Sequence, residues 1–330
     1  MSVYSEQASK DEAMQLKEAI ENAYSAVGVT VKITETMVHK NNETVRALTV
    51  TKPEGEGSTV VSPTIYPRNY EKDISAGVTL EEIGERIRHQ VDLAYENSPK
   101  LPVLTPEEAE KHIRMVLINK TENPEIVKNT PHYDIGDADI TAIPRWFMDA
   151  ESGTDTASFI VNNDVAKTLH MTGQEVIDLG YNNTQAETFK VRSMEEVMAE
   201  IMGPEFAAIM PPSETPEMIV ISNDSGLYGA SGIINERAME QVAEKLGTDE
   251  FFIIPSSVHE TIAIKSEGNN PEDVKKMIRD VNANEVSKQD FLSNELMKYK
   301  GGRIELAIKP KIDKPIVVTP NLEIKHKMKM

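Results

Sequence analysis

The fold is decided by residues Gly226–Lys265, which read GLYGASGIINERAMEQVAEKLGTDEFFIIPSSVHETIAIK. An apolar run, an amphipathic segment and a second apolar run follow one another, so the pattern predicts a strand, a helix and a strand. The helix, Glu236–Leu246, is expected to end at Gly247, because glycine readily adopts the left-handed conformation that closes a helix. A compact polar turn, Pro255–Glu260 (PSSVHE), follows the second strand.

The segment before the helix contains three closely spaced glycines. Asn223–Gly226 (NDSG) has the residues of a tight turn, and we expect the chain to return from it as a strand over Tyr228–Ile234. A phosphate-binding loop would run straight into a helix, which GLYGASG does not. The glycines therefore indicate a strand packed closely against a neighbour.

Upstream, the pattern predicts a separate α+β unit. Apolar residues recur at helical spacing over Ser5–Tyr24, and alternating runs on either side of Lys40–Asn42 predict a hairpin. A proline-containing stretch then interrupts every periodicity, so we place a domain joint there. The predicted divisions are an N-terminal α+β unit, 1–98, a main α+β domain, 103–308, and a basic C-terminal tail, 309–330.

The predicted fold class is α+β, with a mainly antiparallel sheet, packed helices and strand-strand-helix units. Short turns, rather than helical crossovers, join most neighbouring strands, as antiparallel pairing requires. One helix begins after Ser193 and is rich in methionine. Its spacing could offer an adaptable surface to a partner helix, but helical periodicity favours core filling. The methionines are Met194, Met198, Met202 and Met210.

Composition excludes several classes of function. The 330 residues include no cysteine, which removes disulfide frameworks, thiol nucleophiles and iron–sulfur clusters. The formal charge of −19 argues against a nucleic-acid-binding surface, which needs clustered lysine and arginine. No secretory signal or membrane-spanning run is visible, so we expect a soluble, cytoplasmic protein that does not bind membranes.

The charge is unevenly placed along the chain. Residues 298–330 contain nine basic and three acidic residues, a net charge of +6, which leaves −25 on residues 1–297. A basic tail on an acidic body suggests either docking within the chain or contact with an acidic partner, although a solvated terminus is favoured.

The PSSVHE turn brings together residue types that serve in catalysis. The candidate catalytic residues are Ser256, Ser257, His259 and Glu260. Triads, however, usually draw the nucleophile and base from separate segments, and no G-x-S-x-G motif surrounds either serine. If residues 258–264 form a strand, His259 and Glu260 point to opposite faces. The pattern therefore favours a polar corner that caps the sheet over a catalytic site.

Metal binding is not expected. His132, the aspartates at 134, 137 and 139, and His259 are suitable ligand types, but the calcium-loop and HExxH patterns are absent. We therefore predict no metal and no cofactor. A small ligand could instead bind in a cleft between the two predicted units. The candidate ligand-binding residues are Tyr66, His132, Asn223 and Tyr228.

Several segments resemble one known family. They read VLINKTENPEIVKNTPHYDIGDADI, TGQEVIDLGYNNT, GASGIINERAMEQVAEKLGTDEFFIIPSSVHE and VNANEVSKQDFLSNELMKY. With SPTIYPRNYEKDISAGVTLEEI upstream, the similarity covers most of residues 60–300 and leaves 309–330 outside. The family is bacterial domain of unknown function family 5688, which is uncharacterised and occurs in Gram-positive gut bacteria, often near mobile-element genes. The resemblance implies a cytoplasmic location and a mobile-element context, and no catalytic residues.

Three functional interpretations follow. The leading one is a non-enzymatic interaction protein, an accessory of a mobile element whose acidic surface engages a basic host protein. The second is a hydrolase or transferase with its site at the PSSVHE turn. The third is a protein that binds a small ligand in the inter-domain cleft.

Overall fold

The computed structural model describes residues 3–53, 62–97, 102–148, 157–203, 213 and 216–309. Helices pack against three sheets in this part of the chain, and every strand pair in them is antiparallel. The predicted α+β class is therefore confirmed.

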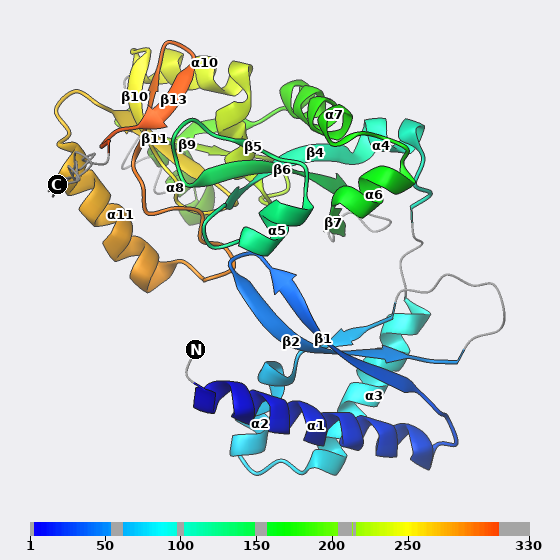
Figure 1. The fold of residues 1–330 in the computed structure, drawn as a ribbon. Helices are drawn as coiled ribbons and strands as arrows, with labels where there is room; N and C mark the ends of the chain where they lie inside the picture. The colour runs from blue at the N-terminus through cyan, green and yellow to red at the C-terminus, as the bar shows by residue number, and fades with distance from the viewer. Residues whose placement is uncertain are drawn as a thin grey trace, which may run out of the picture.

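The N-terminal residues form a three-stranded sheet covered by helices (Figure 1). The first two strands pair over their full length around the turn Asn41–Asn42, which confirms the predicted hairpin. Asn42 adopts the left-handed conformation (φ 60°) that this turn requires. The elements are α1 (Val3–Ala26), β1 (Lys32–Lys40), β2 (Glu43–Thr51), β3 (Thr64–Ile65), η1 (Pro67–Tyr70), α2 (Glu71–Ser75) and α3 (Leu80–Glu96).

These elements enclose a hydrophobic core of their own. Helix α3 buries Ile83, Ile87 and Val91 on one face, since apolar residues three or four positions apart share a helix face. They pack with Leu16 of α1 and Leu48 of β2. The Thr79 side chain accepts a hydrogen bond from the backbone N–H of Glu82 and so caps the start of the helix.

The remaining chain contains a four-stranded and a six-stranded sheet. The first has β6 at its centre, paired with β4 on one side and with β5 and β7 on the other. Its elements are α4 (Pro106–His112), β4 (Ile113–Asn119), α5 (Pro124–Asn129), β5 (Tyr133–Asp134), β6 (Ile140–Phe147), β7 (Ser158–Ile160), α6 (Asn163–Thr168) and α7 (Gly173–Ala186).

The six-stranded sheet has the order β13-β12-β10-β11-β9-β8. The predicted end of helix α10 is confirmed, because Gly247 closes it at φ 68°. Capping boxes at Thr172 and Ser193 begin α7 and α8, and the start of α8 after Ser193 agrees with the sequence prediction. The elements are β8 (Lys190–Ser193), α8 (Met194–Met202), β9 (Met218–Ser222), η2 (Gly229–Ile234), α10 (Glu236–Leu246), β10 (Glu250–Ile254), β11 (Thr261–Lys265), α11 (Pro271–Glu285), β12 (Met297–Lys300) and β13 (Arg303–Leu306).

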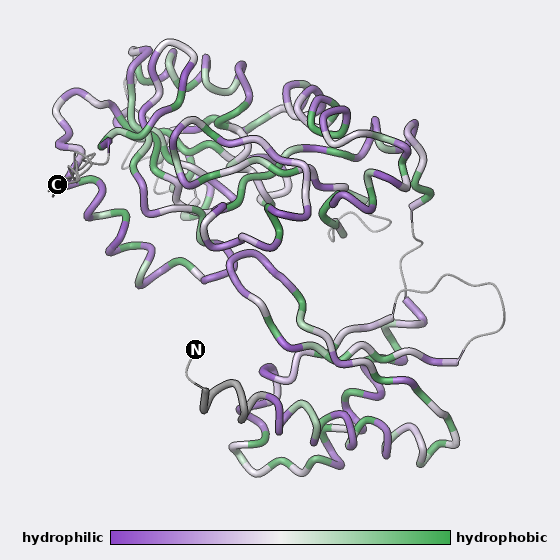
Figure 2. The backbone as a smooth tube through the Cα atoms, viewed as in Figure 1, coloured by the Kyte–Doolittle hydropathy of each residue, from purple (hydrophilic) through white to green (hydrophobic). Residues whose placement is uncertain are grey.

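One hydrophobic core joins these two sheets. Leu117 of β4 and Ala142 of β6 pack in the same cluster as Ile221 of β9, Val242 of α10 and Phe251 of β10. In Figure 1, α7 lies on one side of β4 and β6, and the β1–β2 hairpin approaches from the other. The face of β4 and β6 toward the hairpin is also apolar, and Figure 2 shows green segments along both strands.

Asparagine side chains fasten the hairpin tip to the rest of the protein. The backbone N–H of Asn42 donates to Oδ1 of Asn123 (2.6 Å), and Nδ2 of Asn123 donates back to Oδ1 of Asn42 (2.7 Å). Nδ2 of Asn42 also donates to the carbonyl oxygens of Lys288 and Phe291 (2.9 and 2.6 Å). Asn42 and Asn123 are each only 3% exposed, so these hydrogen bonds satisfy groups that have lost contact with water.

Three local predictions are wrong. Residues 229–234 form the 3-10 helix η2 rather than a strand, because the chain winds over β9 instead of returning beside it. Strand β11 begins at Thr261, so His259 and Glu260 precede it. The methionine-rich helix α8 has no buried residue, and Met202 is 57% exposed, so it does not fill the core. Met210 lies outside the described residues.

The Gly229→Ala substitution should destabilise the protein by about 1–3 kcal/mol, as overpacking does. A Cβ atom there would lie 2.6 Å from the carbonyl oxygen of His259 and 2.7 Å from the amide nitrogen of Asn223. Urea denaturation followed by circular dichroism measures the loss. Gly173→Ala is the matched control, because its Cβ would meet Pro131 at an ordinary 3.5 Å. Equal midpoints for the two variants would contradict the close packing at Gly229.

Candidate functional site

The PSSVHE turn is closed by its own hydrogen bonds. It connects β10 to β11, and the Ser257 hydroxyl oxygen accepts from the backbone N–H groups of His259 and Glu260 (3.0 and 3.3 Å). The Ser257 N–H donates to the carbonyl oxygen of Glu260 (3.1 Å). This is the arrangement of a serine that stabilises a turn.

The His259 imidazole uses both of its ring nitrogens. Nδ1 accepts from the backbone N–H of Tyr228 (3.2 Å), so in the neutral ring Nε2 carries the proton. Nε2 then donates to Oδ1 of Asp290 (3.1 Å), whose other oxygen accepts from the Ser287 hydroxyl (2.7 Å). Among the described residues, no serine hydroxyl is hydrogen-bonded to this ring. The imidazole therefore positions Tyr228, which has the unusual left-handed backbone of φ 58° and ψ 23°.

A cavity of about 540 Å³ opens beside His259. One wall is the tip of the β1–β2 hairpin with Tyr66, and the opposite wall contains His259, Gln289 and Asp290. The floor is the apolar face of β4 and β6, and helix α5 and strand β7 complete the lining. The apolar floor residues are Val116, Ile118, Ile126 and Ile143.

Arg145 of β6 is the charged group nearest this floor. Its Nε donates to the Ser158 hydroxyl (2.8 Å) and its Nη2 to the Ser158 carbonyl oxygen (3.2 Å), and the guanidinium carbon lies 4.6 Å from the centre of the Tyr228 ring. Burial lowers the pKa of Arg145, yet no carboxylate in the described part of the chain pairs with it. A partly buried, protonated guanidinium without a counterion is costly unless a ligand supplies one.

Two further cations lie near Arg145. Lys40 lines the same cavity, with its Nζ 3.8 Å from the centre of the Tyr66 ring and no salt-bridge partner among the described residues. Arg114 of β4 lies directly opposite Arg145 in the β4–β6 ladder. Like charges at such positions repel, but Arg114 has the carboxylate of Glu187 as a partner, whereas Arg145 has none among the described residues.

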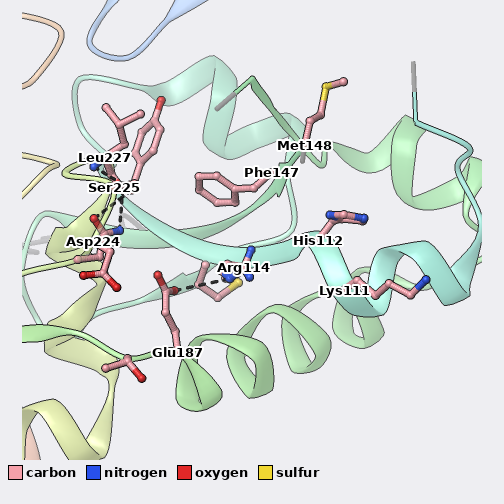
Figure 3. A pocket seen from close by; sticks show the side chains of 13 residues that line it. Lys111, His112, Arg114, Phe147, Met148, Glu187, Asp224, Ser225 and Leu227 are labelled. Carbon is pink, nitrogen blue, oxygen red and sulfur yellow. Dashed lines mark hydrogen bonds and ion pairs between the residues drawn. The ribbon is translucent and has the colours of Figure 1, made fainter. Parts of the chain in front are cut away.

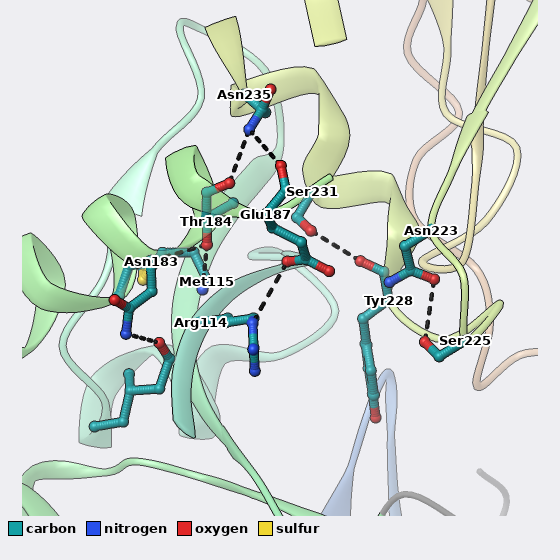
Figure 4. A network of polar contacts seen from close by, with 12 residues as sticks. Arg114, Met115, Asn183, Thr184, Glu187, Asn223, Ser225, Tyr228, Ser231 and Asn235 are labelled. Atoms are coloured by element: carbon teal, nitrogen blue, oxygen red, sulfur yellow. Dashed lines mark hydrogen bonds and ion pairs between the residues drawn. The ribbon is translucent and has the colours of Figure 1, made fainter. Parts of the chain in front are cut away.

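Tyr228 also lines a second cavity, of about 390 Å³, which Figure 3 shows from close by. The second cavity is lined by Arg114, Phe147, Glu187, Asn223 and Tyr228 among others. Figure 4 shows the Arg114 and Glu187 side chains directed toward each other, with Nε and Oε2 3.8 Å apart. Burial is the main reason that the pKa of Glu187 is raised, and Arg114 opposes the rise.

The structure brings together some of the predicted residues. Tyr66, Tyr228 and His259 line the 540 Å³ cavity, and Asn223 joins Tyr228 at the second one. His132 lines neither cavity, and its Nδ1 contacts the carbonyl oxygen of Thr130 (2.9 Å). Ser256, Ser257 and Glu260 also lie outside both linings. The catalytic assignment of the turn therefore stays a prediction.

The aspartates near His132 have structural partners. Asp134 pairs with Lys120 (2.8 Å), and Asp137 accepts from the backbone N–H of Leu306 (2.6 Å). Asp139 accepts from the Asn119 amide (2.8 Å). The part of the chain that the structure describes contains no group of three or more potential ligands that could hold a metal ion.

Sequence reasoning missed Arg145, Lys40 and Asp290. A signal for the first is present, because Arg145 is the single charged residue in the apolar strand ITAIPRWF. A lone charge in a buried strand indicates either a buried ion pair or a binding group. Lys40 and Asp290 lie about 250 positions apart in polar segments, where no local pattern distinguishes them from solvated residues.

A family model, described as a family of unknown function (DUF5688), matches residues 13–301. The chain belongs to this family. The DUF5688 match includes the N-terminal helix and hairpin, which lie outside the range of 60–300 expected from the resemblance, and it ends before the basic tail. No curated protein and no solved structure matches the chain. None of the helices within the described ranges of this DUF5688 protein is both long enough and apolar enough to cross a membrane.

Replacing Ser257 by alanine should destabilise the protein by about 1 kcal/mol, because two backbone N–H groups lose their acceptor. Ser256→Ala is the control, since its hydroxyl forms no hydrogen bond to the turn within the described ranges. Thermal and urea denaturation compare the two variants. A larger loss in Ser256→Ala would contradict the assignment of the turn-closing role to Ser257.

Glu187 should make stability fall as pH rises. Its folded-state pKa is raised, so the folded protein holds a proton that the unfolded chain releases above its ordinary value of 4.5. The stability difference between Glu187→Gln and wild type should therefore grow as pH rises from 4.5 through the folded pKa. Urea denaturation at several pH values measures this difference.

Glu250 provides a control with the opposite sign. Hydrogen bonds from Lys298 and Lys300 lower its pKa to about 2, so its contribution is present above 4.5 and is lost as pH falls toward 2. The difference between Glu250→Gln and wild type should shrink on acidification. Parallel pH profiles for the two variants would contradict the environment assigned to Glu187.

Proposed function

We propose that this protein binds a small organic anion, a carboxylate or a phosphate, in a cleft between the N-terminal unit (1–98) and the main domain (103–308). Arg145 is the anchoring residue. The observation that carries the proposal is that this guanidinium lies partly buried at the floor of a 540 Å³ cavity without a carboxylate partner among the described residues.

The charges around the cavity favour an anion. Arg145 and Lys40 are both cations without salt bridges in the described part of the chain. Asp290, the one carboxylate among the described residues of the lining, already accepts hydrogen bonds from His259 and Ser287. A positive recess in a protein of net charge −19 is a departure from the overall charge, and an anionic group of the ligand would compensate it.

The remaining lining favours a ligand with an apolar body. Cavities that bind small molecules are typically about 300–1,000 Å³, mostly apolar, with a few placed polar groups. Val116, Ile118 and Ile143 provide the apolar floor, and the rings of Tyr66 and Tyr228 provide flat walls. A ligand with an aliphatic or aromatic body and one acidic group fits this combination.

The hydrogen bonds of His259 favour binding over hydrolysis. A general base needs a free nitrogen lone pair within reach of the proton that it removes. Here the Nδ1 lone pair accepts from Tyr228, and Nε2–H is directed at Asp290. His259 is therefore a positioning residue that holds one wall of the cavity.

The expectation of a non-enzymatic accessory protein that engages a basic partner stays a prediction. It is compatible with ligand binding, because the charge of −25 on residues 1–297 would attract a basic protein whether or not the cavity is occupied. The hydrolase or transferase interpretation remains the alternative, and salt-sensitive co-purification with a basic protein would favour the accessory role.

Replacing Arg145 by methionine should abolish anion binding without loss of stability. Removing a partly buried, unpaired charge and keeping an apolar side chain of similar length should leave the unliganded protein as stable as wild type or more stable. Thermal unfolding with inorganic phosphate, citrate, succinate and benzoate tests this, with ionic strength held constant by sodium chloride. At least one of these anions should raise the wild-type Tm and leave that of Arg145→Met unchanged.

The control is Lys167→Met, which removes a cation of 76% exposure from the surface of α6. This variant should respond to the anions as wild type does, which separates binding from general screening of charge. Identical responses in wild type, Arg145→Met and Lys167→Met, or a fall in the stability of unliganded Arg145→Met by several degrees, would contradict the proposal.

A further inference from the structure

A third cavity, of about 410 Å³, is lined by three tyrosines from different elements. Tyr133 comes from β5, Tyr181 from α7 and Tyr299 from β12. Helix α10 contributes Glu236 and Glu240 to the lining. None of these residues lines either of the cavities beside Tyr228, so this is a separate site.

The tyrosine rings present aromatic surfaces at different angles. The rings of Tyr133 and Tyr181 meet edge to face, with centroids 6.2 Å apart and planes at 73°. Tyr299 is held from behind by Phe251, which stacks on it at 4.8 Å. The Tyr133 hydroxyl oxygen is buried, and it has no hydrogen-bond partner among the described residues.

The charged residues of the described lining are all acidic. Glu236 and Glu240 lie one turn apart on α10, where like charges repel, and neither forms a salt bridge within the described residues. Asp134, the other acidic residue of the lining, pairs with Lys120. After burial, the carboxylate of Glu240 is the main reason that the pKa of Tyr299 is raised, which shows that the negative field reaches the rings.

We propose that this cavity binds an alkylammonium group, through the faces of Tyr133, Tyr181 and Tyr299 and the carboxylates of Glu236 and Glu240. Aromatic faces attract cations through their quadrupole, and clustered rings with nearby carboxylates are a recurring way to bind quaternary and alkylated ammonium groups. A metal ion is a poorer match, because its ligands would have to be grouped closely, and the described residues contain no such group.

The ammonium group has two possible sources. One is a free small amine. The other is a lysine of residues 310–330, which contain five lysines and two acidic residues and follow directly on the chain from β13, whose Ile304 lines the cavity. Both sources provide the same alkylammonium group. If a lysine of the chain occupies the cavity, replacing the lysines should strengthen the binding of a free amine; if a free amine is the natural occupant, the replacement should have no effect.

The test compares choline with its neutral isostere, 3,3-dimethylbutan-1-ol, by titration calorimetry and ligand-observed NMR on the full chain. Choline should bind, and the isostere should bind at least about fivefold more weakly, because it has the same shape without the charge. Tyr181→Leu should weaken choline binding by about fivefold, whereas Tyr181→Phe should retain it. The Glu236→Gln, Glu240→Gln double variant should weaken it similarly. Thermal unfolding confirms that each variant is folded.

A full chain with all five lysines of residues 310–330 replaced by glutamine distinguishes the sources; these are Lys311, Lys314, Lys325, Lys327 and Lys329. Stronger choline binding to this variant than to wild type identifies the C-terminal lysines as competitors for the cavity, and equal binding identifies a free amine as the occupant. The proposal is overturned if choline binds neither protein, if the isostere binds as well as choline, or if the glutamine and leucine variants bind choline as wild type does.

Discussion

The candidate site depends on the two reciprocal hydrogen bonds between Asn42 and Asn123. Both side chains are buried, and each amide donates to and accepts from groups on the other side of the junction. Because an unsatisfied buried amide costs about 1–3 kcal/mol, the hairpin tip has one strongly preferred position against α5 and the segment 288–291. That position places Lys40 and Tyr66 opposite Asp290, and so sets the width of the cavity.

The cavity beside His259 and the cavity lined by the three tyrosines differ in the sign of their charged side chains. Arg145 and Lys40 lie in one lining, and Glu236 and Glu240 lie in the other, each without a salt bridge among the described residues. A chain selected for stability alone would pair or remove a charge such as that of Arg145, since partly buried unpaired charge lowers stability, whereas Glu236 and Glu240 are exposed. Their presence in recesses, where a ligand can provide the missing charge, links the electrostatics of the protein to its proposed binding.

Local structure was largely predictable, because its causes are local. Alternation around Asn41–Asn42 predicted the hairpin, and Gly247 predicted the end of α10. The strand predicted around Gly229 was wrong because a glycine is compatible both with a strand and with a close backbone contact. Here η2 lies so close to the carbonyl oxygen of His259 that a side chain at position 229 would not fit. Of the residues that line the cavity, only Tyr66, Tyr228 and His259 were candidates from the sequence. The neighbours of Arg145 are set by tertiary packing, which the spacing of residues in the sequence does not reveal.

The junction at the hairpin tip also bears on how the protein is made. Three of its hydrogen bonds join residues 246 to 249 positions apart, from a turn near the start of the chain to a segment near its end. A ribosome that has synthesised the first two-thirds of the chain has produced the hairpin but neither His259 nor Asp290. Because domains fold as the chain emerges from the ribosome, the N-terminal residues can fold early. The tip of the β1–β2 hairpin stays solvated until residues 288–291 have been synthesised. The cavity is consequently completed late, because Val258, His259, Gln289 and Asp290 form one of its walls.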